Sequence, residues 1–369
     1  MTDQRLAIVV FNLGGPDSPE AVRPFLFNLF NDPAIIGLPF LPRRLLASLI
    51  SRRRDKKAQG IYALMGNRSP ILPNTEAQAA ALVTALTASA ASAANGGGAA
   101  GAAGTAGAEY RVFIAMRYWH PLTAETAAAV KAYQPSQVIL LPLYPQFSTT
   151  TTASSYAAWM RAAKAAAIPA PHRLICCYPV EAGFVLAARA ILQGALAEAA
   201  TKAPQARPLV ILSAHGLPKK VVDAGDPYVA QVEAGAAAIA AALDLPRDQW
   251  VVSYQSRVGP LEWVGPATDA VIAQAAQEQR AIVVFPIAFV SEHSETLVEL
   301  DIEYRHLAEQ NGAPAYVRAP TVSTHPDFIA GLARLVQAAL ADDKAVQPGN
   351  SQRFCANAAK CACKAPVPS

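Results

Sequence analysis

Residues 7–16 read AIVVFNLGGP, an apolar run of Ile, Val and Phe that stops at two glycines and a proline. A run without alternating polar residues is typical of a strand that is buried on both faces of a parallel sheet. Similar runs recur along the chain, separated by segments long enough for crossover helices. The expected strands span residues 7–13, 112–116, 137–143, 173–178, 209–214, 250–255, 281–287 and 315–319.

These strands fall into two sets of four. We therefore predict an α/β protein with two similar Rossmann-like, doubly wound lobes, each built on a four-stranded parallel sheet. The first lobe is expected over residues 1–190 and the second over residues 191–343. Ligands of open α/β sheets bind beyond the carboxyl ends of the strands, so the active site is expected in a cleft at those ends, between the lobes.

Two segments differ from this pattern. Residues 87–109 are rich in Ala, Gly and Ser and lack side chains that could fill a core, which predicts a flexible surface insertion. Residues 344–369 form a tail of weak periodicity that nevertheless carries three of the five cysteines.

The composition excludes several classes of protein. A chain of 369 residues with 53% hydrophobic residues and a net charge of +4 is neither a disordered protein nor a dedicated nucleic-acid binder. Phosphate-binding motifs of the GxxxxGK[ST] and GxGxxG types are missing, which disfavours a nucleotide cofactor. The start of the sequence shows no secretory signal, and no uninterrupted apolar stretch is long enough to span a membrane, so we expect a cytoplasmic protein.

Residues 31–62 combine clustered apolar residues with seven basic ones, Arg43, Arg44, Arg52, Arg53, Arg54, Lys56 and Lys57. This combination favours peripheral docking of this lip segment on the anionic inner face of a membrane. The alternative is an ordinary helix that packs on the lobe and turns its basic face to water.

His215 ends an expected strand in the sequence SAHGLP and so lies at a strand mouth. A neutral imidazole can accept a proton or bind a metal there, although a loop-capping histidine is the plainer interpretation. The segment 291–307 is expected to form a helix capped by Ser291, with one acidic stripe. That stripe contains Glu292, Glu295, Glu299, Glu303 and His306.

Such a stripe usually faces water, but this helix follows the strand at 281–287 directly, which brings its first turn to the edge where His215 is expected. Arg117, Tyr118 and Trp263 also follow strand ends or lie in a Gly/Pro-rich loop. They could hold a flat ligand with carboxylates, or pack at the edge of a core.

Cys355, Cys361 and Cys363 form a C-x5-C-x-C group in the tail. Three thiolates need a fourth ligand to close a zinc or iron–sulfur site, and Cys176 or Cys177 could supply it. The alternative is three free thiols.

Several motifs together resemble the ferrochelatase family, over roughly residues 7 to 340. They are FNLGGPDSPEAVRPFLFNLFNDP, MRYWHPLT, LPLYPQFSTTTTASS, LSAHGLPKK, YQSRVGPLEWVGP and PIAFVSEHSETLVELDIEY. The resemblance implies a two-lobed class II chelatase fold and a lyase that inserts Fe²⁺ into protoporphyrin IX to form protohaem, the terminal step of haem biosynthesis. Related chelatases for cobalt or nickel, and a tetrapyrrole carrier without chemistry, are the alternatives.

The resemblance also implies roles for individual residues. His215, Glu295 and Glu299 match the catalytic positions, with His215 and Glu295 meeting the metal and Glu299 leading protons away. The porphyrin contacts match Leu13, Arg53, Arg54, Tyr62, Ser69, Arg117, Tyr118, Trp263 and His293. Residues 64–70 depart from the family, which has a glycine run there. Some members hold a [2Fe-2S] cluster, which here would use Cys355, Cys361, Cys363 and Cys177.

Overall fold

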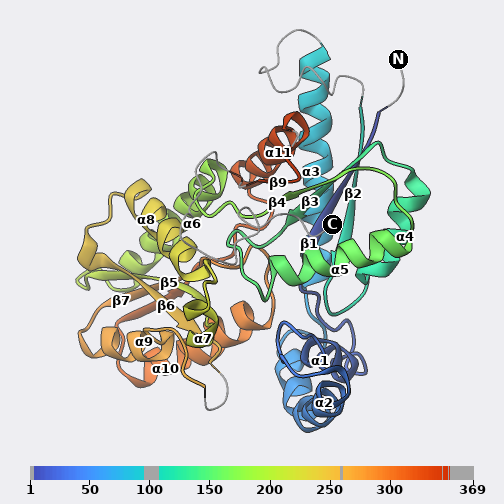
Figure 1. Ribbon diagram of the computed structural model, residues 1–369. Helices are drawn as coiled ribbons and strands as arrows, with labels where there is room; N and C mark the ends of the chain where they lie inside the picture. The colour runs from blue at the N-terminus through green and yellow to red at the C-terminus, as the bar shows by residue number, and fades with distance from the viewer. Residues whose placement is uncertain (1–3, 95–107, 258–260, 343, 348, 350–369) are drawn as a thin grey trace. The chain divides into compact units, whose positions relative to one another are not determined.

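The computed structural model describes residues 4–94, 108–257, 261–342, 344–347 and 349. Contacts divide the chain into two compact units (Figure 1). The described residues up to Tyr178 and those from Ile329 onward make up the first unit, and Pro179–Phe328 make up the second.

The first unit is built on a parallel sheet with strand order β2-β1-β3-β4-β9. Its core strand β1 is completely buried from Leu6 to Asn12, as the unbroken apolar run predicted. Helix α3 packs against β2, α4 packs against α5, and α1 and α2 form a helical pair set apart from the sheet (Figure 1). The elements are β1 (Arg5–Asn12), α1 (Val22–Phe30), α2 (Phe40–Ala63), α3 (Ile71–Ala94), β2 (Glu109–Met116), α4 (Thr123–Tyr133), β3 (Gln137–Pro142), α5 (Thr152–Ala165), β4 (His172–Ile175), α11 (Pro326–Ala341) and β9 (Val346–Gln347).

The second unit has a parallel sheet with strand order β6-β5-β7-β8. Helices α6 and α8 cover one face, and α9 and α10 cover the other (Figure 1). The elements are α6 (Ala182–Lys202), β5 (Pro208–His215), α7 (Lys219–Asp223), α8 (Tyr228–Ala242), the 3-10 turn η2 (Arg247–Gln249), β6 (Trp250–Gln255), α9 (Thr268–Gln277), β7 (Ala281–Pro286), the π-helix η3 (Glu295–Glu303), α10 (Tyr304–Gln310) and β8 (Ala315–Arg318). All eight expected strands are present, which confirms the predicted fold class.

The division between the units differs from the expected boundary at residue 190. That boundary would cut α6 in two, whereas α6 packs along its length against β7, β8 and α8 and buries Phe184 and Leu192. The units therefore divide before this helix, at Tyr178 and Pro179. By length and composition α6 could also cross a membrane, but this packing makes it a core helix of the second unit.

The expected surface insertion and tail also differ from the prediction at their first residues, which form regular secondary structure. Residues 87–94 continue helix α3, because alanine is the best helix former and Leu86 and Ala90 bury one side of the helix. The tail starts with strand β9, in which Val346 pairs with Leu174 of β4. In the same region the Arg173 guanidinium donates hydrogen bonds to the carbonyl oxygens of Ala339 (2.7 Å) and Leu340 (2.8 Å). Residues 95–107 and the tail cysteines lie outside the described part of the chain.

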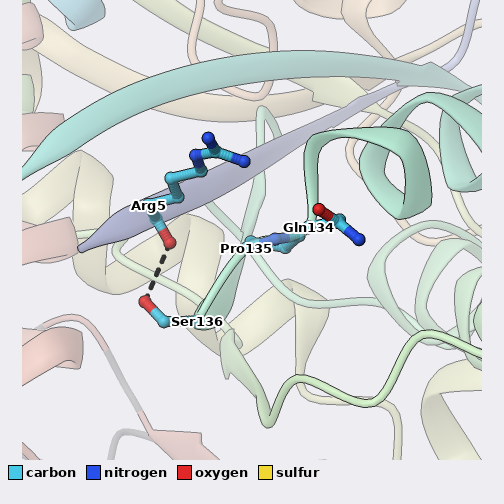
Figure 2. Close-up of a pocket in the computed structure, with 4 residues that line it drawn as sticks. All are labelled: Arg5, Gln134, Pro135 and Ser136. Carbon is cyan, nitrogen blue, oxygen red and sulfur yellow. Dashed lines mark hydrogen bonds between the residues drawn. The ribbon is translucent and has the colours of Figure 1, made fainter. Parts of the chain in front are cut away.

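A shallow pocket of about 300 Å³ lies at the amino-terminal edge of the first sheet (Figure 2). Arg5, Gln134, Pro135 and Ser136 line it, and the Ser136 hydroxyl donates to the carbonyl oxygen of Arg5 across 2.9 Å. The carboxyl ends of the strands, which carry the predicted site residues, form the opposite edge. This pocket contains none of those residues.

Candidate active site

The carboxyl edge of the second sheet gathers the residues with chemistry. His215 is the last residue of β5 and pairs in register with Gln255, the last residue of β6. Ser213 of β5 pairs with Pro286 at the end of β7, and β7 leads into the segment that carries Glu295. Three adjacent parallel strands thus deliver their polar ends to one edge, as the motif positions predicted.

The His215 imidazole lies against the carboxylate of Glu295. Its Nδ1 is 2.9 Å from Glu295 Oε2, and the two side chains are 38% and 29% exposed. His293 Nε2 lies 3.9 Å from the same carboxylate oxygen, while His293 Nδ1 is 3.1 Å from the carbonyl oxygen of Ser291. The structure therefore brings together three predicted site residues, His215, His293 and Glu295.

Electrostatics couple the pair. Desolvation lowers the pKa of His215, but the charge of Glu295, its hydrogen bond and the charge of Glu299 outweigh it, so the pKa of His215 is raised above its ordinary value of 6.5. Desolvation raises the pKa of Glu295, but its contacts with His215 and His293 outweigh that and lower the pKa well below its usual range. The carboxylate of Glu295 therefore stabilises the protonated form of His215, a group that can take up and release protons.

Glu299 is held by several donors. Its Oε1 accepts from the Ser256 backbone N–H (2.9 Å) and the Tyr304 hydroxyl (3.1 Å), and its Oε2 accepts from the Gln255 amide (3.1 Å) and the Ser256 hydroxyl. Desolvation and the nearby charge of Glu295 raise the pKa of Glu299, although the hydrogen bonds from Ser256 and Gln255 oppose that rise. Two carboxylates one turn apart therefore differ in their readiness to hold a proton, an arrangement typical of acid–base sites.

The helix that carries both glutamates differs from the prediction. It is π-helical from Glu295 to Glu303, and Ser291 lies before it instead of capping it. The expected acidic stripe assumed an α-helical period of 3.6 residues, which a π-helix with i→i+5 hydrogen bonds does not keep. Only two of its members, Glu295 and Glu299, reach the site.

The other members of the expected stripe lie elsewhere. Glu292 pairs with Arg318 across 2.7 Å and accepts from the Thr321 backbone N–H (3.0 Å). Glu303 and His306 are exposed.

Trp263 lies beside the loop that follows His215. A short antiparallel bridge joins Trp263 to Pro218, and a Cβ at Gly216 would come within 3.2 Å of the Trp263 ring. The same Cβ would lie 2.9 Å from the backbone carbonyl oxygen of Gln255, closer than real Cβ atoms come, which explains the Gly after the histidine.

In the first unit, Asp32 organises two predicted site residues. This carboxylate is buried and accepts from the Arg117 guanidinium (2.7 Å), the Tyr118 hydroxyl (2.9 Å) and the Ser154 hydroxyl (2.6 Å). Ser154 in turn accepts from Arg117 Nε (2.8 Å). Asp32 could not be identified as a site residue from the sequence, because an Asp after a helix resembles an ordinary exposed cap.

The predicted contacts of the first unit are distributed between its core and its surface. Tyr62 and Tyr118 are buried in an apolar cluster with Val22, Phe25 and Leu26, and Leu13 packs partly exposed against it. Tyr118 has a raised pKa through its burial and Asp32. Burial of both tyrosines favours a packing role over direct ligand contact.

The remaining predicted contacts of the first unit also divide. Ser69 is buried beside Gly15 and accepts from the Ile71 backbone N–H (3.3 Å). Arg53 and Arg54 are exposed on α2.

Among the described residues, no group of three or more His, Cys, Asp or Glu side chains could hold a metal ion. Cys176 and Cys177 are buried after β4 with their Sγ atoms 3.6 Å apart. The predicted partners of Cys177 lie outside the described residues.

Comparison with known proteins agrees with this geometry. The family model described as Ferrochelatase matches residues 5–340. Ferrochelatases from Phenylobacterium zucineum and Caulobacter vibrioides are 53% and 50% identical, each over 98% of this chain and 98% of the relative. The ferrochelatase from Rickettsia bellii is 43% identical over 98% of this chain and 95% of its own length. Because the match runs through both units and includes the His–Glu–Glu edge of the second, the chain belongs to the ferrochelatase family.

Proposed function

We propose that this protein inserts ferrous iron into protoporphyrin IX to form protohaem. The observation that carries the proposal is the contact between His215 and Glu295 at 2.9 Å, with Glu299 one turn further on, at the strand edge where α/β sheets bind ligands. Family membership over nearly the full length supports the same activity.

Iron insertion requires two protons to leave the pyrrole nitrogens as Fe²⁺ takes their place. His215 uses Nδ1 for Glu295, so its Nε2 lone pair serves the substrate, either as proton acceptor or as a short-lived iron ligand. Glu295 stabilises the imidazolium that forms. Glu299, whose pKa is raised, is the next group able to take up a proton and pass it on.

The activity is tested by anaerobic incubation of the purified protein with ferrous iron and protoporphyrin, with the optical spectrum followed for haem. Haem formation at enzymatic rates supports the proposal. Porphyrin binding without haem formation would contradict it and point to a carrier.

The acid side of the pH–rate profile should report His215. Only the neutral imidazole can accept a proton, so kcat/KM should fall as the pH drops through an apparent pKa above 6.5, the ordinary value for histidine. Glu295→Gln removes the charge that raises this pKa while desolvation remains, so the acid limb should move to lower pH. The measurement is kcat/KM for iron insertion across the neutral range.

Glu303→Gln is the matched control, because Glu303 is an exposed carboxylate at the other end of the same π-helix. Its profile should overlay that of the wild type. An acid limb that stays in place in Glu295→Gln would show that another group titrates.

We also propose that the protein is cytoplasmic and docks at the inner face of the membrane through the lip segment, residues 31–62. Its helix α2 exposes Phe40 (56%), Leu41 (70%), Leu45 (73%) and Leu49 (45%). Leu41, Leu45 and Leu49 follow at intervals of four residues and so share one face of the helix. The basic residues of the segment favour anionic headgroups, and the apolar face favours the acyl boundary that holds a greasy substrate.

The variant Leu41→Gln/Leu45→Gln should lose at least about tenfold in partition to vesicles that contain phosphatidylglycerol, because each buried leucine contributes about 1.5–3 kcal/mol. Co-sedimentation measures the partition. Leu186→Gln is the control, since Leu186 is an exposed leucine (44%) on α6. Equal binding of the double variant and the wild type would refute docking through this face.

The [2Fe-2S] cluster stays a proposal that rests on the tail cysteines Cys355, Cys361 and Cys363. The Gly349 backbone N–H donates to the Cys177 carbonyl oxygen (2.7 Å), six residues before Cys355. This contact supports Cys177 as the fourth ligand.

A further inference from the structure

Gln255 connects the two catalytic glutamates. Its side chain is 1% exposed at the end of β6. The amide Nε2 donates to Glu299 Oε2 (3.1 Å) and to the backbone carbonyl oxygen of Glu295 (3.2 Å). One amide group therefore joins a full turn of the π-helix to the strand beside His215.

A chain of buried hydroxyls lies behind this amide. The Ser213 hydroxyl donates to Gln255 Oε1 (2.8 Å) and lies 3.0 Å from the Thr268 hydroxyl, which lies 2.8 Å from the Ser253 hydroxyl. Ser213, Ser253 and Thr268 are fully buried. The chain runs from Ser253 of β6 through Thr268, in the first turn of α9, and Ser213 of β5 to the amide.

Strand geometry explains why these residues meet. Side chains two residues apart point to the same face of a strand, so Ser213 lies on the face of His215, and Ser253 on that of Gln255. The register pairs Ser213 with Ser253 and His215 with Gln255. The same face of β5 carries Leu209 and Ile211, which belong to the apolar core. This face of the sheet is thus apolar at Leu209 and Ile211 and polar at the two residue pairs nearest the site, Ser213 with Ser253 and His215 with Gln255.

Buried hydroxyls cost free energy unless they are hydrogen-bonded, and an apolar layer would fill this space without that requirement. The network leaves the amide one satisfactory orientation. If the amide were reversed, its oxygen would face two acceptors, Glu299 and the carbonyl of Glu295, and repel both. The two acceptors therefore determine which end of the Gln255 amide meets the carboxylate, and the Ser213 hydroxyl satisfies the amide oxygen at the other end.

We propose that Gln255 is a positioning residue for iron insertion, which holds Glu299 in one place relative to Glu295, and that Ser213, Thr268 and Ser253 hold its amide group in place from behind. The proposal deepens the proposed function and rests on it. Glu299 remains the catalytic residue, and Gln255 acts through it.

Gln255→Met, which keeps the length of the side chain and removes both donors, should lower kcat by about 10- to 100-fold, the size expected when a catalytic group is displaced by about 1 Å. The KM for porphyrin should stay unchanged, because Glu299 acts on protons and not on ring binding.

Thr268→Val removes the hydroxyl at nearly constant volume and should also lower kcat. Thr268→Ser keeps the hydroxyl, so its kcat should be higher than that of Thr268→Val. Thr126→Val, at a buried threonine of α4 in the first unit, is the matched control and should keep the wild-type kcat.

The activity result would overturn the proposal if Gln255→Met kept wild-type kcat, or if Thr268→Ser lost as much as Thr268→Val, which would indicate packing alone. Thermal unfolding of each variant shows whether it folds.

A second readout does not depend on chelation: the side-chain amide signal of Gln255 in ¹⁵N NMR, assigned by its loss in Gln255→Met. It should shift in Glu299→Ala and in Thr268→Val and shift less in Thr268→Ser. An unchanged signal in Glu299→Ala would overturn the proposal even if the wild type inserts iron. A wild type without haem formation would contradict the proposed function alone, because the NMR test would still decide the role of Gln255.

Discussion

His215→Ala is expected to lower the rate of iron insertion by about 10²- to 10⁴-fold, the usual contribution of a general base. The variant loses the imidazole that faces the substrate and leaves Glu295 without its hydrogen-bonded partner. Porphyrin binding should be retained, because ring contacts are predicted on other residues. Stopped-flow detection of haem under anaerobic conditions measures the rate, and quenching of protein fluorescence measures porphyrin binding.

His306→Ala is the matched control, since His306 is an exposed histidine on α10. It should insert iron at the wild-type rate. If His215→Ala inserts iron within a few-fold of the wild type while porphyrin still binds, His215 is not the central group and the assignment of the site fails.

Asp32→Ala is expected to destabilise the first unit by about 3–5 kcal/mol, the usual result of removing one partner of a buried ion pair. The Arg117 side chain is 17% exposed, and the truncation would leave its charge without Asp32 in a largely buried position. The hydroxyls of Tyr118 and Ser154 would lose the same acceptor. Urea unfolding, followed by tryptophan fluorescence, measures the loss in the free energy of unfolding.

Two further variants separate the buried charge from general damage. Asp32→Ala/Arg117→Met should be more stable than Asp32→Ala alone, because it removes the charge that Asp32→Ala leaves behind. Asp17→Ala, at an exposed position of the same unit, should unfold like the wild type. Equal losses in the single and double variants would mean that the ion pair is not the cause.

The sheets could be predicted from the sequence because their central strands, β1, β3, β5 and β7, are buried on both faces. Every strand from β1 to β8 contains an unbroken apolar run, and each run predicted its strand to within a few residues. His215 could be placed for the same reason, since a residue that ends a buried parallel strand lies at the ligand-binding edge.

Other features of the site could not be predicted, because they depend on tertiary contacts. The amphipathic period of residues 291–307 is compatible with an α-helix, and nothing in it indicates the wider π-turns of Glu295–Glu303. In the sequence Gln255 is an ordinary residue at the end of a strand. Its role depends on the hydrogen bonds that Ser213 makes with it and with Thr268 in the fold. Asp32 likewise has a role only through its ion pair with Arg117, which is 85 residues further along the chain.

The first unit is made of two separate stretches of the chain, with the second unit between them, and this affects the order in which the units fold during synthesis. A ribosome delivers the chain from its N-terminus, and domains tend to fold as units while they emerge. Residues 179–328 are complete before the last strand of the first sheet, β9, has been made. We therefore expect the second unit to reach its native state on the nascent chain, whereas the first must wait with the far edge of β4 open until Val346 and Gln347 have been added.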